Sequence, residues 1–451
     1  MKTRTILSFG AAIIILLLIS ASSVQAEWQE FDKVTAGDGA ADDFFGTSVC
    51  VSGDYAIVGA YKDDVNGSES GSAYIFKKDG AAWTLQTKIT ATDGAAGDWF
   101  GWSVSISGDY VIVGAYGDDD RGSDSGSAYI FKRNGTAWSQ LAKLTASDGA
   151  AYDLFGYSVS ISGDYAIAGA YRDNSYRGSA YIFKRDGTAW TEQTKLTASD
   201  GAAYDLFGCS VGISGDYAII GAYRDDTYRG SAYIFKRNGT TWSQLAKLTA
   251  SDGTTYDLFG YSVGISGNYA IVGAYRDDTY RGSAYVFVWN GTNWVQQAKL
   301  TASDGAAYDV FGWSVGISGD YAIVGAEEDD DKGSSSGSAY VFKRDGTAWP
   351  QLVKLTASDG AASDYFGSSV SISDYFAIIG ANGDESNLGS AYLFADCPYS
   401  DLTGNCFIDF EDLALLANDW LNCSSSNLTG DCFIDFEDFA LLANDWLKGQ
   451  K

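Results

Sequence analysis

The chain repeats one segment of 52 or 55 residues seven times, and this repetition constrains its fold more than any other feature. Each unit reads approximately KLTASDGAAYDxFGxSVxISGDYAIVGAY, then a variable acidic loop, then GSAYIFKRxGTxW. The units begin at the lysines Lys33, Lys88, Lys143, Lys195, Lys247, Lys299 and Lys354. A fixed period of this length indicates a repeat architecture in which each unit buries its apolar face against its neighbours.

Each unit contains four short segments that predict β-strands. In the third unit these are residues 155–162, 165–171, 178–184 and 190–197, which are rich in aromatic and β-branched side chains and are separated by Gly and Asp turns. Four-stranded units at this period predict an all-β fold, a seven-bladed β-propeller whose blades close into a ring and leave only short strand edges.

The two ends of the repeat region predict how the ring closes. The seventh unit ends near Phe394 without its Trp strand, whereas an orphan Trp strand stands at residues 28–33. Trp28 precedes Lys33 by five residues, as Trp83 precedes Lys88. We therefore expect the N-terminal strand to be the outermost strand of the last blade, a clasp that hides both edges. A parallel solenoid is the alternative, but it requires capping units and has no use for a split unit.

Phe-Gly and Gly-Ala pairs recur in order in all seven units, from Phe45-Gly46 with Gly59-Ala60 to Phe366-Gly367 with Gly380-Ala381. Over residues 28–394 this pattern resembles the FG-GAP repeat, the blade unit of the integrin α-subunit propeller and of many secreted prokaryotic proteins. A short Ser-Gly-Asp turn replaces the calcium loop of many such blades, so the resemblance does not imply calcium there. We expect the Phe to fill the layer between blades and the Gly to permit close backbone approach near the axis.

Two kinds of loop emerge on one face if the Phe-Gly strand is innermost. The blade-to-blade loop is nearly invariant and contains Asp148 and Asp153 in one copy, whereas the loop after the second strand varies in length and is longer at residues 62–70, 117–125 and 327–336. Variation confined to one face favours a ligand-binding face. Tyr with Asp and Arg, as in residues 172–177, suits a sugar or a protein, and the clusters 118–120 and 329–331 suit hard cations. Solvated turns that keep the repeat soluble are the alternative.

Composition excludes several chemistries. The chain has no His, so it cannot form a Ser-His-Asp or Cys-His nucleophile system or a His-ligated zinc site. Three G-x-S-x-G segments, residues 208–212, 260–264 and 312–316, lie in predicted innermost strands that no helix follows, so the nucleophile-elbow context is missing. A net charge of −28 disfavours nucleic acid as a partner. We therefore expect no catalytic residues and no nucleic-acid partner.

The first 26 residues predict a secretory signal peptide. Lys2 and Arg4 precede an apolar stretch, and the small-residue site 24–26 predicts cleavage after Ala26. A membrane anchor is the alternative, although the apolar run is short for a span. No second run of spanning length follows, so we expect a secreted or cell-surface protein with no membrane span in the mature chain. Its predicted domains are the propeller, residues 27–395, and a tail, residues 396–451.

The tail contains a second repeat, residues 401–421 and 427–447, whose copies are 26 residues apart. Oxygen-bearing side chains recur at loop positions one, three, five, nine and twelve, a spacing that wraps a loop around one calcium ion, and an apolar helical stripe follows each loop. The predicted metal ligands are Asp401, Thr403, Asn405, Asp409 and Asp412 in the first copy and Asn427, Thr429, Asp431, Asp435 and Asp438 in the second.

This duplicated loop and helix resembles a dockerin, a small calcium-dependent module of the EF-hand type that binds cohesin domains on scaffold or cell-surface proteins. The resemblance implies two Ca²⁺ ions and a small α-helical domain. It also implies a cohesin-like partner contacted by loop positions ten and eleven, which are Phe410, Glu411, Phe436 and Glu437. The sixth loop position, normally Gly, is Cys406 or Cys432. A structural cap on the propeller is the alternative.

Cysteine spacing is typical of an oxidising compartment. Four of the six cysteines lie in the tail, and repeat symmetry favours bridges between Cys397 and Cys406 and between Cys423 and Cys432 among the three pairings that four cysteines allow. Cys50 and Cys209 occupy non-equivalent positions in their blades, and we expect both to be unpaired and buried.

These patterns together predict a secreted, non-catalytic propeller that binds a carbohydrate or protein ligand and is tethered by a calcium-loaded tail. A polysaccharide-active enzyme is an alternative, because abundant Asp residues could act as an acid and base pair. However, the acidic residues repeat in every blade, whereas catalysis needs a singular constellation. A purely structural surface protein is the third hypothesis.

Overall fold

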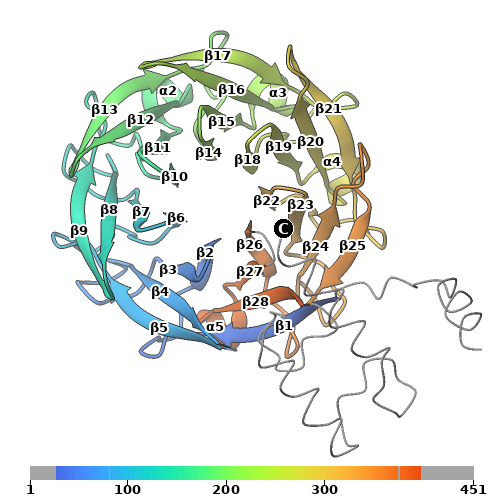
Figure 1. Cartoon of the computed structure of the whole chain (residues 1–451), viewed down its shortest axis with the longest axis horizontal. Helices are drawn as coiled ribbons and strands as arrows, with labels where there is room; N and C mark the ends of the chain where they lie inside the picture. The colour runs from blue at the N-terminus through green and yellow to red at the C-terminus, as the bar shows by residue number, and fades with distance from the viewer. Residues whose placement is uncertain (1–26, 81, 374–375, 398–451) are drawn as a thin grey trace, which may run out of the picture. The chain divides into compact units, whose positions relative to one another are not determined.

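The computed structural model describes residues 27–80, 82–373 and 376–397, and Trp28–Ala395 forms one compact unit. This unit consists of seven four-stranded antiparallel sheets arranged around a common axis (Figure 1). The strand that follows each Phe-Gly pair lies nearest the axis and the Trp strand lies outermost. The prediction of an all-β, seven-bladed propeller is therefore confirmed.

The strands of each blade follow one another from the axis outward. Blade 1 contains β2 (Phe45–Ser52), β3 (Tyr55–Ala60), β4 (Ser72–Asp79) and β5 (Ala82–Ile89), and blade 2 contains β6 (Ser103–Ser107), β7 (Tyr110–Ala115), β8 (Ser127–Asn134) and β9 (Ala137–Leu144). Blade 3 contains β10 (Ser158–Ser162), β11 (Tyr165–Ala170), β12 (Ser179–Asp186) and β13 (Ala189–Leu196). Blade 4 contains β14 (Val211–Ser214), β15 (Tyr217–Ala222), β16 (Ser231–Asn238) and β17 (Thr241–Leu248).

The remaining blades repeat this order. Blade 5 contains β18 (Val263–Ser266), β19 (Tyr269–Ala274), β20 (Ser283–Trp289) and β21 (Trp294–Leu300), and blade 6 contains β22 (Ser314–Ser318), β23 (Tyr321–Ala326), β24 (Ser338–Lys343) and β25 (Gln351–Leu355). Blade 7 contains β26 (Phe366–Ser373), β27 (Phe376–Ala381), β28 (Ser390–Cys397) and β1 (Glu27–Val34). Short turns α2 (Asp173–Tyr176), α3 (Asp225–Tyr228), α4 (Asp277–Tyr280) and α5 (Asp384–Asn387) follow the second strands of blades 3, 4, 5 and 7.

The innermost strand of the third unit begins later than its sequence predicts, at Ser158 instead of Phe155. Gly156 has a φ of 85°, so the backbone turns there before it joins the ladder. In blades 1 and 7 the strand does begin at Phe, and a bulge follows between Phe45 and Ser48 in blade 1. The glycine of the motif therefore bends the chain at the point where each blade begins.

The hydrophobic core lies in layers between adjacent blades. Phe155 is fully buried, and its cluster combines Ile130 and Leu144 of blade 2 with Tyr181 and Phe183 of blade 3. The equivalent Phe residues are all 0% exposed: Phe45, Phe100, Phe155, Phe207, Phe259, Phe311 and Phe366. The predicted role of Phe as the filler of the layer between blades is confirmed.

Glycines permit main chains of neighbouring blades to touch. A Cβ atom on Gly59 would stand 1.9 Å from the carbonyl oxygen of Gly101, and one on Gly114 would stand 2.0 Å from that of Gly156. The first glycine of each pair comes from a Gly-Ala motif and the second from the Phe-Gly motif of the next blade. The prediction that glycine allows close approach near the axis is confirmed.

The sheet of blade 7 has the order β1-β28-β27-β26, so the first described strand occupies the outermost position. Trp28 is 5% exposed and its ring lies 5.9 Å from that of Tyr321. The Glu30 carboxylate accepts hydrogen bonds from the backbone N–H and hydroxyl of Ser358, at 2.8 and 2.7 Å. Segments far apart in sequence thus share one blade.

Cys50 and Cys209 are unpaired, as predicted. Cys209 is buried, but Cys50 is only half-buried, so the prediction of burial is wrong for Cys50. Its side chain packs against the hydrophobic cluster between blades 1 and 2 without being enclosed by it.

The predicted signal peptide and the predicted tail domain lie outside the described residues, apart from the end of β28. In the part of the chain that the structure describes, no helix combines the length and the apolar character that crossing a membrane requires.

We predict that Gly114→Ala destabilises the propeller by about 3 kcal/mol, because the added methyl group meets the Gly156 carbonyl and neither main chain can move without shifting its blade. Gly37→Ala is the matched control, since nothing lies within 4 Å of its Cβ position and neither glycine has a positive φ. Urea unfolding of both variants measures the difference. Equal stabilities would show that close approach of the blades does not constrain the ring.

Candidate functional site

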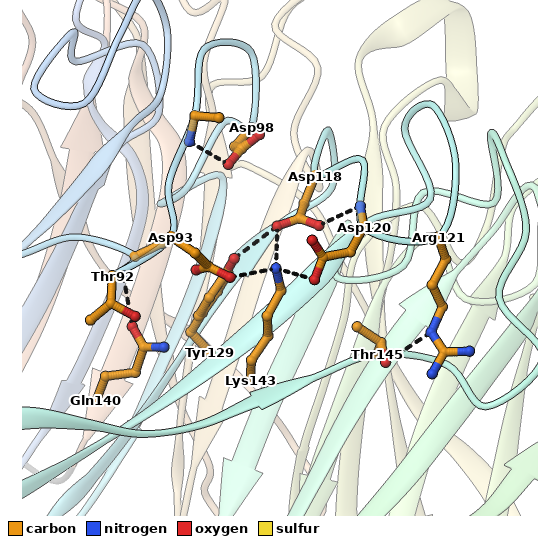
Figure 2. A network of polar contacts seen from close by, with 12 residues as sticks. Thr92, Asp93, Asp98, Asp118, Asp120, Arg121, Tyr129, Gln140, Lys143 and Thr145 are labelled. Carbon is orange, nitrogen blue, oxygen red and sulfur yellow. Dashed lines mark hydrogen bonds and ion pairs between the residues drawn. The ribbon is translucent and has the colours of Figure 1, made fainter.

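The two kinds of loop meet at one end of each blade, where a lysine joins them. In blade 2, Lys143 on β9 points into a group of carboxylates (Figure 2). Its Nζ lies 2.8 Å from Asp93 in the entry loop, and 2.8 and 2.5 Å from Asp118 and Asp120 in the loop after β7. The hydroxyl of Tyr129 on β8 donates to Asp118 at 2.8 Å. The predicted placement of both loop types on one face is confirmed by these contacts.

All seven blades contain this set of a lysine, two aspartates and a tyrosine. We call it the lysine–aspartate network. Blade 7 takes its lysine, Lys33, from β1, and that Nζ lies 2.7 Å from both Asp359 and Asp384. The other sets are Asp38, Asp63, Tyr74 and Lys88; Asp148, Asp173, Tyr181 and Lys195; Asp200, Asp225, Tyr233 and Lys247; Asp252, Asp277, Tyr285 and Lys299; and Asp304, Asp329, Tyr340 and Lys354.

Mutual attraction keeps these groups charged. Burial opposes the charge of Lys143, yet its three carboxylate partners raise its pKa above the ordinary value of 10.5. Burial likewise opposes the charge of Asp93, but the hydrogen bond from Lys143 lowers the pKa of that carboxyl below 3.8. Asp118 is only 3% exposed, so loss of the ammonium would leave a buried charge unpaired. The network therefore fixes both loops to the outermost strand.

The acidic clusters 118–120 and 329–331, for which the sequence suggested a hard cation, have other partners. Asp329 and Asp331 pair with Lys354 as their counterparts pair with Lys143. The middle residue, Asp330, accepts the backbone N–H of Ser335 at 2.8 Å. Within residues 27–80, 82–373 and 376–397, no three or more Asp, Glu, Cys or His side chains are grouped so as to hold a metal ion. The lysine that begins every unit was the sequence feature from which this pairing could have been predicted.

A second buried aspartate closes each entry loop. The Asp98 carboxylate accepts the backbone N–H of Ala95 at 2.8 Å (Figure 2). Burial raises the pKa of Asp98 to about 6, and that hydrogen bond only partly opposes the rise. Its counterparts in the other blades are Asp43, Asp153, Asp205, Asp257, Asp309 and Asp364, which make the same contact three residues back.

A cavity of about 320 Å³ lies on the axis, and its lining includes the equivalent serine of every blade. These serines belong to the repeated S-V pair, and they include the G-x-S-x-G residues Ser210, Ser262 and Ser314. The Ser210 hydroxyl oxygen accepts the N–H of Val263 in the next blade at 3.1 Å, and Ser314 donates to the carbonyl of Gly367 at 2.7 Å. The serine hydroxyls thus connect neighbouring blades.

Aromatic side chains crowd the loop-bearing end of this cavity. They come from the residue after Phe-Gly and the residue after Gly-Ala, two positions that vary among otherwise constant neighbours. Trp102 lies 5.1 Å from Tyr116, and Tyr261 lies 4.7 Å from Tyr275, measured between ring centroids. This cluster was not predicted from the sequence. The change of residue type at these two positions, among otherwise constant neighbours, was the feature that could have indicated it.

In blade 6, Glu327 occupies the position after Gly-Ala at which blades 1 to 5 have a tyrosine. It is half-buried, and burial together with the neighbouring charge of Glu328 raises its pKa from 4.5 to about 8. The carboxyl group therefore carries its proton at neutral pH. Its charge, when present, raises the pKa values of Tyr261 and Tyr275, which burial already raises.

The predicted ligand, partner and bridge residues of the tail lie outside the described side chains. They are the ten oxygen-bearing residues between 401 and 438, the residues 410, 411, 436 and 437, and the four tail cysteines.

The FG-GAP repeat matches the chain over seven segments, residues 28–76, 83–131, 138–183, 190–235, 242–287, 294–342 and 349–394. Each segment runs from a Trp strand through the three inner strands of the next blade, and the first begins at Trp28 of β1. A search of curated proteins finds no match to the chain.

Glu327→Gln should change how stability depends on pH. Between pH 4.5 and 8 the unfolded chain ionises Glu327 while the native chain keeps its proton, so this residue's contribution is full below pH 4.5 and is lost as pH rises through about 8. Relative to the unmodified protein, the variant should gain about 2 kcal/mol between pH 5 and 9, a value reduced for residual solvent contact. Thermal unfolding at both pH values measures this gain. Glu328→Gln, at the exposed neighbour, should show only a small part of this gain, because it removes the lesser of the two causes of the raised pKa, and an equal gain would contradict the assignment to Glu327.

Proposed function

The chain belongs to the FG-GAP repeat family, and we propose that its propeller is a secreted, non-catalytic module that holds a carbohydrate or protein ligand on its loop-bearing face. Propellers of this family are commonly ligand-binding or structural modules and are generally non-catalytic. The main observation that supports ligand binding is that the two faces of the propeller differ. The loop-bearing face has all the length variation and the most exposed tyrosines, whose exposed fractions are 57% at Tyr152, 60% at Tyr204, 57% at Tyr256 and 61% at Tyr308.

The opposite face carries a repeated ion pair in four of the blades. There Arg133, Arg185, Arg237 and Arg344 each form an ion pair with an aspartate of the adjacent turn, Asp109, Asp164, Asp216 and Asp320 respectively. These arginines also lie over tyrosine rings, at 4.6 Å for Arg185 and Tyr110. A surface whose charged groups already have partners offers less to a ligand than one with exposed aromatic rings.

The hydrolase alternative requires two carboxyl groups with different roles at one place. In the described blades the aspartates of the lysine–aspartate network and of the entry loops occur as sevenfold copies that are bound to lysines or to backbone N–H groups. The repetition argues for a structural role of these acids and leaves the loop-bearing face for binding.

We also infer that β1 closes the ring. It carries the Trp and the lysine that blade 7 otherwise lacks, and Lys33 makes the contacts that Lys88 makes in blade 1. Such a pairing of distant segments covers the edge of β28 and holds the two ends of the repeat region together.

An array of glycans and extracellular proteins tests the ligand-binding role. The full chain should bind at least one probe, and Tyr204→Ser with Tyr256→Ser should lower that signal at least about fivefold, because exposed aromatic rings dominate such contacts. Arg185→Ser with Arg237→Ser, on the opposite face, is the control and should leave the signal unchanged. No bound probe, or equal loss in both variants, would favour a purely structural protein, and release of reducing ends from a glycan would favour the enzyme.

For the tail, residues 396–451, we propose a dockerin-like, disulfide-bridged module that binds two Ca²⁺ ions and tethers the propeller to a cohesin-like protein. Support comes from its duplicated spacing of oxygen-bearing residues, which matches the six to eight oxygen ligands that calcium requires. The secretory signal at residues 1–26 is consistent with both the bridges and the extracellular calcium.

Calorimetric titration of the full chain with calcium tests the tail. We expect about two ions per chain, and we expect Asp409→Ala with Asp435→Ala to abolish the binding, since each removes a carboxylate ligand. Asp119→Ala with Asp330→Ala is the matched control in the propeller loops and should bind calcium normally. Absence of heat in the unmodified chain, or heat that survives the tail substitutions, would refute the assignment.

A further inference from the structure

The loop-bearing face is divided into two chemically different parts. The longer loops of blades 1, 2 and 6 expose mainly acidic side chains, which are Asp64, Glu69, Asp119, Asp120, Glu328, Asp330 and Asp331. The shorter loops of blades 3, 4 and 5 instead carry an arginine and a tyrosine each, which form a group with a tyrosine of the next entry loop. We call these three adjacent groups the arginine–tyrosine arc: Arg172, Tyr176 and Tyr204; Arg224, Tyr228 and Tyr256; Arg276, Tyr280 and Tyr308.

Each group of the arc spans the seam between two blades. Tyr228 comes from α3 of blade 4 and Tyr256 from the entry loop of blade 5, and their ring centroids lie 5.3 Å apart with the planes 33° from parallel. The corresponding values are 5.4 Å and 22° for Tyr176 and Tyr204, and 5.5 Å and 27° for Tyr280 and Tyr308. The two rings at each seam thus stack on one another, and we call each pair a platform. The ring from the entry loop is the more exposed of the two, at 60% for Tyr204, 57% for Tyr256 and 61% for Tyr308, so it is the one that can meet a ligand.

An arginine lies beside each platform, between it and the aromatic residues at the loop-bearing end of the axial cavity. The Arg224 guanidinium lies 5.4 Å from the ring of Tyr228 and 5.6 Å from the ring of Tyr223, which lines the axial cavity. Arg172 and Arg276 take the same position between their own two tyrosines. Each guanidinium is therefore held in place by ring contacts and keeps edges with which it can donate to a ligand.

These three arginines lack a carboxylate partner among the described residues, unlike the arginines of the opposite face. The aspartate next to Arg224 in sequence, Asp225, is buried and pairs with Lys247 of the lysine–aspartate network. The second arginine of the loop, Arg229, pairs with Asp226 at 3.2 Å. Because the neighbouring aspartates already have cationic partners, the guanidinium of Arg224 remains available to an anionic ligand.

The platforms are preorganised by the backbone. Tyr228 and Tyr256 have φ values of 64° and 77°, a left-handed conformation that is unfavourable for a bulky side chain. Hydrogen bonds across the seam hold it, because the Tyr228 carbonyl accepts the N–H groups of both Tyr256 and Leu258, at 3.1 and 3.2 Å. A ligand then meets rings that are already in position, so ordering them does not reduce its affinity.

We propose that the arginine–tyrosine arc binds an anionic polysaccharide built of uronic acid units. This proposal rests on the proposed ligand-binding role of the face and names its substrate class. Each platform stacks against the apolar face of a sugar ring, and the adjacent arginine binds the carboxylate of that or the next unit. Three equivalent groups on successive blades suit a ligand that is itself periodic, because linked contacts raise the overall affinity.

The test is calorimetric titration of the full chain with polygalacturonate, compared with the same polymer fully methyl-esterified and with polyglutamate. We expect polygalacturonate to bind at least about tenfold more tightly than either comparison, because only it offers both carboxylates and sugar faces. Equal affinity for the esterified polymer would overturn the role of the arginines. Equal affinity for polyglutamate would overturn the role of the sugar and favour an acidic protein, including the acidic loops of a second copy.

Two sets of variants locate the site. Arg172→Gln, Arg224→Gln and Arg276→Gln together, and separately Tyr204→Ala, Tyr256→Ala and Tyr308→Ala together, should each weaken polygalacturonate binding at least about tenfold. The matched control is the triple variant Arg133→Gln, Arg185→Gln and Arg237→Gln on the opposite face, because each of these arginines already has an aspartate partner. It should change the affinity less than about twofold. An unchanged thermal unfolding temperature shows that a variant is folded, and Arg→Lys at the same three positions should partly restore binding.

The outcomes separate this proposal from the broader one. Binding of a neutral glycan or a protein that is lost with the tyrosine set but not with the arginine set would overturn the uronic acid proposal and support the ligand-binding face. Binding of polygalacturonate that survives both sets would overturn the arc as its site. Failure of every probe on polymers and arrays alike would overturn both proposals.

Discussion

The ring depends on main-chain contact between neighbouring blades at paired glycines. Gly59 faces the carbonyl of Gly101, and Gly114 faces that of Gly156, with no room for a Cβ atom at either place. Because the contact joins backbones, it sets the distance between blades near the axis. The Phe of the same motif then fills the layer farther out, and seven equal steps close the ring (Figure 1).

The lysine–aspartate network explains how so acidic a chain tolerates the convergence of carboxylates at one end of each blade. Every lysine neutralises at least two aspartates, which lets residues such as Asp118 and Asp225 be buried with their charge. The same pairing has a consequence for the surface. It occupies the buried aspartates of the short loops of blades 3, 4 and 5 and leaves Arg172, Arg224 and Arg276 available, whereas the longer loops keep additional unburied acids.

Most of the architecture was predictable because its signals are local and repeated. The period, the four strands, the innermost position of the Phe-Gly strand and the role of its two residues all follow from patterns that occur seven times. The start of β10 was predicted three residues early, because the bend at Gly156 depends on the neighbouring blade. Cys50 was predicted to be buried, but this cysteine occurs in only one blade, so no repeated pattern indicated how far its neighbours enclose it.

The amino-acid sequence by itself determined the repeat, the number of blades and the residue types at every loop, since these depend on spacing along one chain. Only the tertiary structure decided which charges are used internally and which remain for a ligand. Asp118 and Lys143 are 25 residues apart, and Tyr228 and Tyr256 belong to different blades, so neither pair is visible as a motif. Carboxylate clusters that suggested a cation site became partners of lysines. The arginines and tyrosines of loops such as residues 172–177, for which the sequence suggested a sugar or a protein, were joined by tyrosines of the next entry loop to form the candidate binding surface. The physical reason is that ion pairing and ring stacking depend on distance in space, which closure of the ring sets.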